Sequence, residues 1–123
     1  MAKTNKILIA EDDPFLIKVM GTILQDEGFA VDTARDGEEA LKKITANGYK
    51  LVLLDLVMPK KNGFEVLEDM KAKKIKTPVL VFSNLSQDSD RKEAVSLGAK
   101  DYFVKSDMSI DEVAEAVKKY ISK

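Results

Sequence analysis

Residues 51–59, LVLLDLVMP, place one aspartate inside an apolar run that ends in a proline. A short run of branched aliphatic residues beside turn residues is typical of a buried strand. The carboxylate of Asp55 would be costly in a dry interior unless it were paired, hydrogen-bonded or bound to a metal ion. We therefore expect Asp55 to lie at the rim, where the strand ends. Pro59 is expected to stop this segment, and Gly63 to form a turn that needs unusual dihedral angles.

Similar apolar runs lie on both sides of this segment, and stretches with helical periodicity separate them. The expected strands are residues 6–10, 29–34, 51–54, 78–83 and 101–104. One of the expected helices, over residues 89–97, is more polar than the others. Five strands that alternate with five helices predict an α/β fold with a parallel sheet, helices on both faces and right-handed crossovers. We expect a single domain over residues 1–123.

Residue types at the expected helix starts agree with this arrangement. Asp13, which precedes a proline, is interpreted as a helix N-cap rather than a metal ligand. Asp36 with Glu39, and Ser109 with Glu112, have the spacing of capping boxes, in which each side chain accepts a hydrogen bond from the other residue's backbone N–H. These residues therefore support helices that begin near positions 14, 37 and 110.

Composition excludes several classes of function. The 123 residues are 45% hydrophobic and 33% charged, with a net charge of −1 and neither cysteine nor histidine. Disulfides, thiolate metal sites, histidine zinc sites and Ser-His-Asp triads are thus excluded, and the lack of cysteine fits a reducing cytoplasm. We expect neither nucleic-acid nor membrane binding, because no global positive charge and no long apolar segment is present. The lysine-rich run at residues 71–76 is interpreted as a solvated helix end and loop.

Polar side chains follow four of the five expected strands. Glu11-Asp12-Asp13, Asp55, Ser83 and Lys105 each come after the last apolar residue of a strand. In an open parallel sheet the binding crevice lies at this carboxyl edge, so we expect these groups to converge there. Converging carboxylates repel one another by about 1–4 kcal/mol per pair at ~4 Å, and a hard divalent cation such as Mg²⁺, Mn²⁺ or Ca²⁺ would remove that cost. Such a site can organise phosphoryl transfer.

Four segments in register resemble the receiver domains of two-component response regulators, over the whole chain. They are ILIAEDDP (7–14), LVLLDLVMPKKNGFEVL (51–67), PVLVFSN (78–84) and LGAKDYFVK (97–105). The resemblance implies a doubly wound, flavodoxin-like (βα)₅ sandwich with strand order 2-1-3-4-5. It also implies that Asp55 accepts a phosphoryl group from a histidine of a sensor kinase or of a histidine phosphotransfer protein. Glu11, Asp12, Asp55 and the backbone carbonyl of Val57 would hold Mg²⁺, with Mn²⁺ as a possible substitute.

The same resemblance assigns three further roles. Ser83 would hydrogen-bond the phosphoryl group, and Lys105 would pair with another of its oxygens. Tyr102 occupies the position of the aromatic residue whose rotamer follows activation. The fourth helix, fifth strand and fifth helix would then form a switching surface. The chain is expected to be a monomer, or a weak dimer that forms through this surface. The downstream partner is not indicated.

Two positions depart from the family pattern. Ser106 follows Lys105, where the family usually has a proline after a cis peptide bond. A cis bond before a non-proline residue costs about 2.5–4 kcal/mol, so we expect a trans bond with Lys105 still reaching the site. Asn84 replaces a smaller residue and is expected to narrow access to the phosphoryl group, which would alter the lifetime of the phosphorylated state.

Other functions remain open at this stage. Ser106 and Asn84 leave room for a receiver-like interaction module that is not phosphorylated. A phosphatase with an aspartate nucleophile would normally need a second aspartate where Val57 stands. A flavodoxin-type nucleotide site would need a phosphate loop after the first strand. We expect a stand-alone receiver or one cut from a longer protein. It would not be a conventional enzyme, although it would catalyse its own phosphorylation and dephosphorylation.

Overall fold

The computed structural model describes residues 5–122, which form five strands and five helices in alternation. The strands are β1 (Lys6–Ala10), β2 (Ala30–Ala34), β3 (Leu51–Leu54), β4 (Val79–Ser83) and β5 (Asp101–Val104). The helices are α1 (Pro14–Asp26), α2 (Gly37–Ala46), α3 (Gly63–Ala72), α4 (Asp88–Ser96) and α5 (Ile110–Ser122). The expected alternation is confirmed. Positions 1–4 and 123 of the expected domain lie outside the described residues.

All neighbouring strands of the sheet are parallel, in the order β2-β1-β3-β4-β5 that the resemblance implied. The register places Ala10 at the end of β1 beside both Ala34 of β2 and Leu54 of β3. Glu11 and Asp55 directly follow Ala10 and Leu54 in the sequence. Both carboxylates are therefore brought to the same edge of the sheet by strand register alone.

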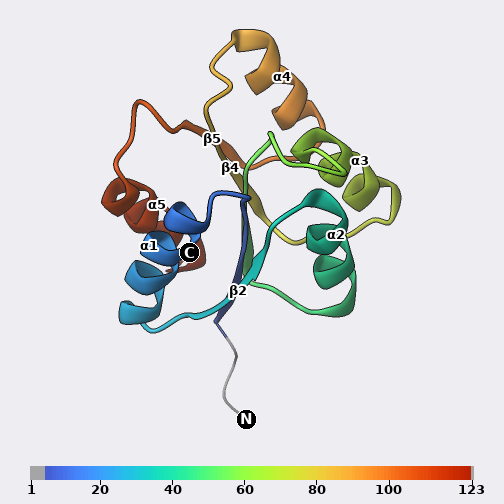
Figure 1. Cartoon of the computed structure of the whole chain (residues 1–123). Coiled ribbons are helices and arrows are strands. Elements are labelled where there is room, and N and C mark those ends of the chain that lie inside the picture. The colour runs from blue at the N-terminus through green and yellow to red at the C-terminus, as the bar shows by residue number, and fades with distance from the viewer. Residues whose placement is uncertain (1–4, 123) are drawn as a thin grey trace.

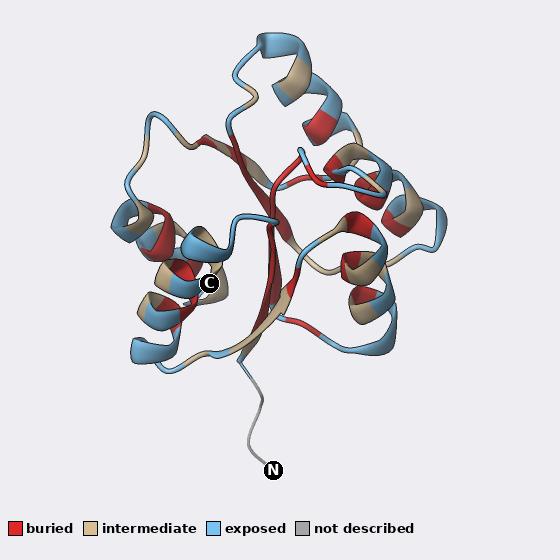
Figure 2. Cartoon of the chain, in the orientation of Figure 1, coloured by how far each residue is buried: buried red, intermediate tan, exposed pale blue. Residues whose placement is uncertain are grey.

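Helices cover both faces of the sheet (Figure 1). α1 and α5 lie on one face, and α2, α3 and α4 lie on the other. Buried residues run along the strands and along the helix sides that face them, as Figure 2 shows. Within residues 5–122, no helix has both the length and the apolar character needed to cross a bilayer.

The unbroken apolar run of β3 follows from this three-layer arrangement. Leu51 and Leu53 belong to the core beneath α1 and α5, whereas Val52 and Leu54 belong to the core beneath α2, α3 and α4. A strand buried on both faces has no solvent-facing positions, so apolar and polar residues do not alternate along it. This explains why polar chemistry on the central strand begins only at Asp55.

Four boundaries, in three elements, differ by one residue from those expected. β2 begins at Ala30 because the N–H of Phe29 donates to the carbonyl of Leu24 and so completes the end of α1. β4 begins at Val79 because Pro78 has no N–H to donate. α4 begins at Asp88 and ends at Ser96.

The expected helix caps are present with one difference. Ser109 and Glu112 form the reciprocal capping box at the start of α5. Asp36 accepts a hydrogen bond from the Glu39 N–H, but the Glu39 carboxylate accepts from the N–H of Arg35 instead of that of Asp36. Asp36 therefore caps the first turn of α2, whereas Glu39 holds the residue before the cap. Both negative charges lie near the N-terminus of the helix, where they interact favourably with the helix dipole.

Gly63 is required for close packing, and the expectation of unusual dihedral angles there was wrong. The left-handed conformation in this loop is adopted by Lys60, with φ of 69°, and not by Gly63. A Cβ atom on Gly63 would lie 2.6 Å from the carbonyl oxygen of Asp55 and 2.7 Å from the Cα of Leu56. The first turn of α3 can thus approach the segment that carries Asp55 only if residue 63 has no side chain.

Gly63→Ala is expected to destabilise the protein by about 2–3 kcal/mol, because the clash is with backbone atoms that cannot rotate away. Gly48→Ala is the matched control: a Cβ at Gly48 meets nothing within 4 Å, and the change should be neutral. Urea unfolding of the two variants tests this. Equal free energies of unfolding for Gly63→Ala and Gly48→Ala would show that the Asp55 segment can move away from the new Cβ atom without loss of stability.

Candidate functional site

Asp55 is buried, with 5% of its surface exposed, and its charge is compensated as its sequence context required. Its N–H donates to the carbonyl of Ala10 at 2.9 Å, which fixes its backbone at the edge of the sheet. Its Oδ1 accepts from the N–H of Val57 at 3.2 Å, and its Oδ2 lies 3.1 Å from Nζ of Lys105. A cation and a backbone donor therefore stabilise the carboxylate.

Lys105 joins two buried acids. Its Nζ lies 2.8 Å from Oε1 of Glu11 as well as 3.1 Å from Oδ2 of Asp55. Its backbone N–H donates to the carbonyl of Ser83 at 2.8 Å, so the residue is anchored to the end of β4. No peptide bond within residues 5–122 is cis, so the bond between Lys105 and Ser106 is trans and Lys105 still reaches the site. Both parts of that prediction are confirmed.

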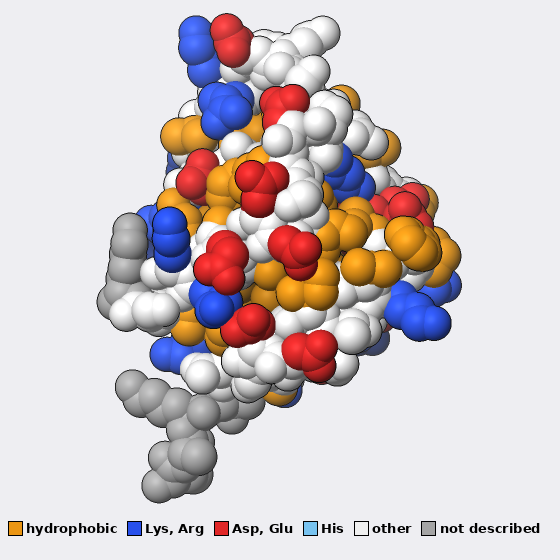
Figure 3. All heavy atoms as spheres, turned by 90° about the vertical axis from the view of Figure 1, so that its left-hand side faces the viewer, with side chains coloured by type: hydrophobic (Ala, Val, Ile, Leu, Met, Phe, Trp, Pro, Cys, Tyr) orange, Lys and Arg blue, Asp and Glu red, His pale blue; other side chains and the backbone are white. Residues whose placement is uncertain are grey.

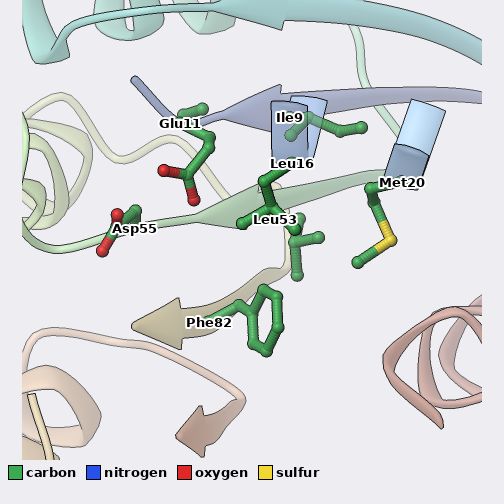
Figure 4. A pocket seen from close by; sticks show the side chains of 8 residues that line it. Ile9, Glu11, Leu16, Met20, Leu53, Asp55 and Phe82 are labelled. Atoms are coloured by element: carbon green, nitrogen blue, oxygen red, sulfur yellow. The ribbon is translucent and has the colours of Figure 1, made fainter. Parts of the chain in front are cut away.

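The surroundings of Glu11 are largely apolar. Figure 4 shows Glu11 and Asp55 at the carboxyl ends of β1 and β3, beside a group of apolar side chains. They enclose a cavity of about 10 Å³, roughly the space of one water molecule. The apolar side chains that line it include Ile9, Leu16 and Phe82. Glu11 is thus removed from bulk water on the side opposite the open rim.

Burial is the main electrostatic influence on Glu11. It raises the pKa of Glu11 from 4.5 to about 7, although the hydrogen bond from Lys105 opposes this effect. For Lys105, burial acts to lower the pKa, but the hydrogen bond to Glu11 and the charge of Asp55 outweigh it and raise the pKa. The three groups form one coupled charge cluster with a single cation and two acids.

This cluster predicts a pH-dependent stability for the metal-free protein. The pKa of Glu11 is higher in the folded chain, about 7, than the ordinary value of 4.5. Folding therefore favours the protonated side chain. Its contribution to the free energy of unfolding is fully present below about pH 4.5 and is lost as the pH rises through about 7. Stability should fall by up to ~3 kcal/mol between pH 5 and pH 8, measured by urea unfolding in a chelator. Glu11→Gln should remove most of this fall, and an unchanged pH slope in that variant would contradict the assignment.

Glu11, Asp12 and Asp55 form a group that can hold a metal ion. Their ligand atoms all lie within 4.8 Å of one another. They open onto a pocket of about 300 Å³, whose lining also includes Asp13, Val57, Asn84 and Lys105. All of the acidic donors are carboxylate oxygens, which suits a hard cation such as Mg²⁺ or Mn²⁺. The exposed Asp12 leaves space for water molecules on such an ion.

Asp13 lines the same pocket but acts as a helix cap. Its Oδ1 accepts hydrogen bonds from the N–H groups of Phe15 at 3.0 Å and Leu16 at 3.5 Å. The N–H of Asp13 donates in turn to Oε2 of Glu11 at 3.2 Å. The N-cap interpretation is confirmed, and the start of α1 helps to orient Glu11.

Ser83 and Tyr102 meet at one backbone unit, that of Leu85. The hydroxyl of Ser83 accepts from the Leu85 N–H at 3.3 Å, and the hydroxyl of Tyr102 donates to the Leu85 carbonyl at 2.6 Å. Both residues are buried, and neither lines the pocket that contains Asp55. The Leu85 backbone therefore links the two residues to which the resemblance assigned a switch. The residue pattern does not indicate this link, because backbone groups are the same at every position.

Arg91 of α4 is a further contact of Tyr102 that the sequence did not indicate. Its guanidinium carbon lies 5.1 Å from the centre of the Tyr102 ring, and its Nη1 donates to the Tyr102 carbonyl at 3.3 Å. Burial, followed by the charge of Asp90, raises the pKa of the Tyr102 hydroxyl, which remains a hydrogen-bond donor at neutral pH. Arg91 thereby ties α4 to β5.

Comparisons with known proteins agree with this geometry. The family model described as the response regulator receiver domain matches residues 7–118. The transcriptional regulatory protein CpxR homolog of Haemophilus influenzae is 43% identical over 97 residues, which are 79% of this chain and 42% of that protein. The gliding motility regulatory protein of Myxococcus xanthus is 32% identical, over 94% of this chain and 15% of its own length. The chain thus spans less than half the length of these curated relatives.

Solved structures give the same result. The receiver domain of the Francisella response regulator 1452 is 31% identical, with a TM-score of 0.90, and the match covers 97% of this chain and 98% of that one. The response regulator protein TrrA of Thermotoga maritima, in complex with Mg²⁺-BeF, is 37% identical with a TM-score of 0.82. That match covers 95% of this chain and 99% of TrrA.

Proposed function

This chain belongs to the response regulator receiver domain family, and from that premise we propose that it is the phosphoacceptor of a two-component system or phosphorelay, with Asp55 as the acceptor. One observation carries the assignment of Asp55. Its buried carboxylate lies at the carboxyl edge of the sheet, 3.1 Å from the ammonium of Lys105 and within 4.8 Å of the ligand atoms of Glu11 and Asp12. A nucleophile, a cation and a set of oxygen donors therefore face the same open pocket.

The proposed reaction is a phosphoryl transfer to Asp55. A carboxylate oxygen of Asp55 attacks the phosphorus of a phosphohistidine on a sensor kinase or phosphotransfer protein. The phosphorus–nitrogen bond breaks, its electron pair remains on the imidazole nitrogen, and that nitrogen can then take up a proton. The products are an acyl phosphate on Asp55 and a free histidine. Lys105 leaves one carboxylate oxygen and pairs with an oxygen of the transferred group. Water later hydrolyses the acyl phosphate, so the chain would not be a conventional enzyme.

The oxygen donors around Asp55 fit a divalent cation. Glu11, Asp12, Asp55 and the carbonyl of Val57 are the groups that would hold Mg²⁺ or, in its place, Mn²⁺. When bound, the ion would neutralise the carboxylates and the charge of the incoming phosphoryl group. The Mg²⁺-BeF complex of TrrA supports a metal site of this kind. Lys105 would then be free of its contact with Glu11.

Ser83 and Tyr102 are proposed to transmit the change. A phosphoryl group adds negative charge and three strong acceptor oxygens, one of which can attract the Ser83 hydroxyl away from the Leu85 N–H. The Leu85 backbone also holds Tyr102, so its movement would alter the surface formed by α4, β5 and α5. The phosphoryl group can shift that surface between two conformations only to the extent that it stabilises one of them more than the other. A cytoplasmic partner protein would bind at this surface, or a second copy of the chain would bind there to form a weak dimer.

The test is the intact mass of the protein after incubation with acetyl phosphate, with Mg²⁺ and with a chelator. We expect one phosphoryl adduct in Mg²⁺, little or none in the chelator, and the adduct in the peptide that contains residues 51–59. An adduct that forms equally in the chelator, or maps elsewhere, would contradict the proposal. If hydrolysis outpaces detection, beryllofluoride can replace the phosphoryl group. Its complex with the protein should form in Mg²⁺ and dissociate when a chelator is added, which provides the same comparison.

Asn84→Ala is expected to shorten the lifetime of the phosphorylated state by about five-fold, equivalent to ~1 kcal/mol in the hydrolysis barrier. Asn84 lines the pocket beside Asp55 and Lys105, so its removal opens a path for water. Loss of the mass adduct with time after removal of the donor gives the rate. Asn47→Ala, at the end of α2 where Asn47 caps the Lys43 carbonyl, is the control and should leave the rate unchanged. Equal lifetimes for all three proteins would exclude a role for Asn84.

A further inference from the structure

A second hollow lies between the ends of α3 and α4, at the amino edge of the sheet. It is a groove of about 360 Å³, bordered by the start of β4 and by Lys100 just before β5. Asp55 is at the opposite, carboxyl edge, so this groove is separate from the proposed phosphorylation site. Figure 1 shows α3 and α4 as neighbours on the same face of the sheet. The loop after α3 and the loop after α4 form its two walls.

The groove is positively charged although the chain as a whole has a net charge of −1. Four described residues in its lining are lysines, at positions 71, 74, 76 and 100, and none of its described lining residues is acidic. In the described part of the chain, none of these four lysines takes part in an ion pair. The opposite side of the molecule, which includes α1 and α5, carries many acidic side chains around apolar ones (Figure 3). Positive charge is therefore concentrated locally, and no acidic side chain among residues 5–122 forms an ion pair with it.

Lys74 has a backbone conformation that a lysine rarely adopts. α1, α3 and α4 end with the same pair of backbone hydrogen bonds, and the residue after each C-cap has positive φ: Gly28 at 98°, Lys74 at 60° and Gly98 at 109°. At α3 the motif is closed by the N–H of Ile75 on the carbonyl of Met70, at 2.9 Å. Glycine adopts this conformation without steric cost, whereas a lysine does not. A helix dipole favours a lysine anywhere in the last turn and does not require one at this position.

The remaining lining shows which ligand the groove suits. Half-buried Ile75 and Leu97 give it apolar surface, and Lys71 closes one side by donating to the Ser96 carbonyl at 3.1 Å. Nucleic-acid sites commonly add aromatic side chains for stacking or arginines for bidentate contacts, and the described lining of this groove has neither. Apolar surface beneath a ring of ammonium groups suits a peptide with carboxylates on both sides of an apolar residue.

We propose that this groove binds an acidic segment of a partner protein. An apolar side chain of the segment packs against Ile75 and Leu97, and its carboxylates pair with Lys74, Lys76 and Lys100. The site does not depend on the proposed function, because none of these residues contacts Asp55 or the groups around it. The proposed phosphorylation and the binding of such a segment can therefore be tested separately.

The test is fluorescence anisotropy of a labelled peptide that has a Leu-Phe pair between two runs of glutamate. We expect saturable binding to the wild-type chain that weakens as salt rises from about 50 to about 300 mM. Lys74→Gly and Lys100→Gln should each weaken binding about three-fold, and the double variant about ten-fold. Lys74→Gly should not lower the melting temperature, because glycine relieves the backbone conformation. Lys18→Gln, on the exposed side of α1, is the matched control for charge.

Three results would overturn the proposal. One is the absence of saturable binding to the wild-type chain. Another is an equal loss of binding in Lys18→Gln and in the double variant, which would indicate attraction by net charge alone. The third is equal binding of a poly-thymidine oligonucleotide or of an all-glutamate peptide, which would indicate a general polyanion surface. Phosphorylation by acetyl phosphate should be the same in the double variant and the wild type, so failure here is distinct from failure at Asp55.

Discussion

Replacing Asp55 with asparagine is expected to abolish phosphorylation by acetyl phosphate, with a loss of at least about 1,000-fold in rate. The amide keeps the size of the side chain but is not a nucleophile. The nearest alternative, Glu11, is directed toward Lys105 in the metal-free protein, and with Mg²⁺ bound it would be a ligand of the ion, so its carboxylate would not be free to accept the phosphoryl group. Intact mass with and without Mg²⁺ measures the effect.

Asp12→Asn is the comparison for this variant. Asp12 is exposed and contributes only to the group of metal-binding oxygens, so its amide should slow phosphorylation and raise the Mg²⁺ concentration required without abolishing the adduct. A phosphoryl adduct of normal yield in Asp55→Asn would show that another residue is the acceptor. Peptide mapping would then identify that residue.

Lys105→Met is expected to destabilise the metal-free protein at pH 8 by about 3–5 kcal/mol. The substitution leaves Glu11 and Asp55, which are 3% and 5% exposed, without the cation that lies 2.8 and 3.1 Å from them. The loss should be smaller at pH 6, because Glu11 can then take up a proton. Mg²⁺ should restore part of the lost stability, since it binds the same carboxylates. Urea unfolding in chelator and in Mg²⁺ gives both values.

The matched control is Lys118→Met, which like Lys105→Met removes a lysine that pairs with two acids, here in an exposed position. Nζ of Lys118 lies 3.0 Å from Oε1 of Glu27, with both side chains more than a third exposed. Such surface pairs contribute less than about 1 kcal/mol, so this variant should be close to the wild type. If Lys105→Met loses no more stability than Lys118→Met, the buried cluster does not depend on its lysine.

The order of elements was determined by the sequence. The unbroken apolar run of β3, the Asp13 cap and the Ser109–Glu112 capping box are local features that act over three or four residues. Local hydrogen bonding and burial decide such features, so they can be predicted without knowledge of the rest of the chain. The position of Asp55 at the carboxyl edge of the sheet could also be predicted from the sequence, because parallel strands have their carboxyl ends at the same edge.

The contacts between these elements were decided only by the tertiary structure. The pairing of Lys105 with Glu11, the meeting of Ser83 and Tyr102 at Leu85, and the requirement for glycine at position 63 all depend on atoms that approach within a few ångströms. The same holds for the groove between α3 and α4, whose lysines come from separate loops. Residue type and spacing specify which segments fold and where their polar ends lie. Strand register and helix packing then determine which charges meet, because those distances depend on the arrangement of the whole chain.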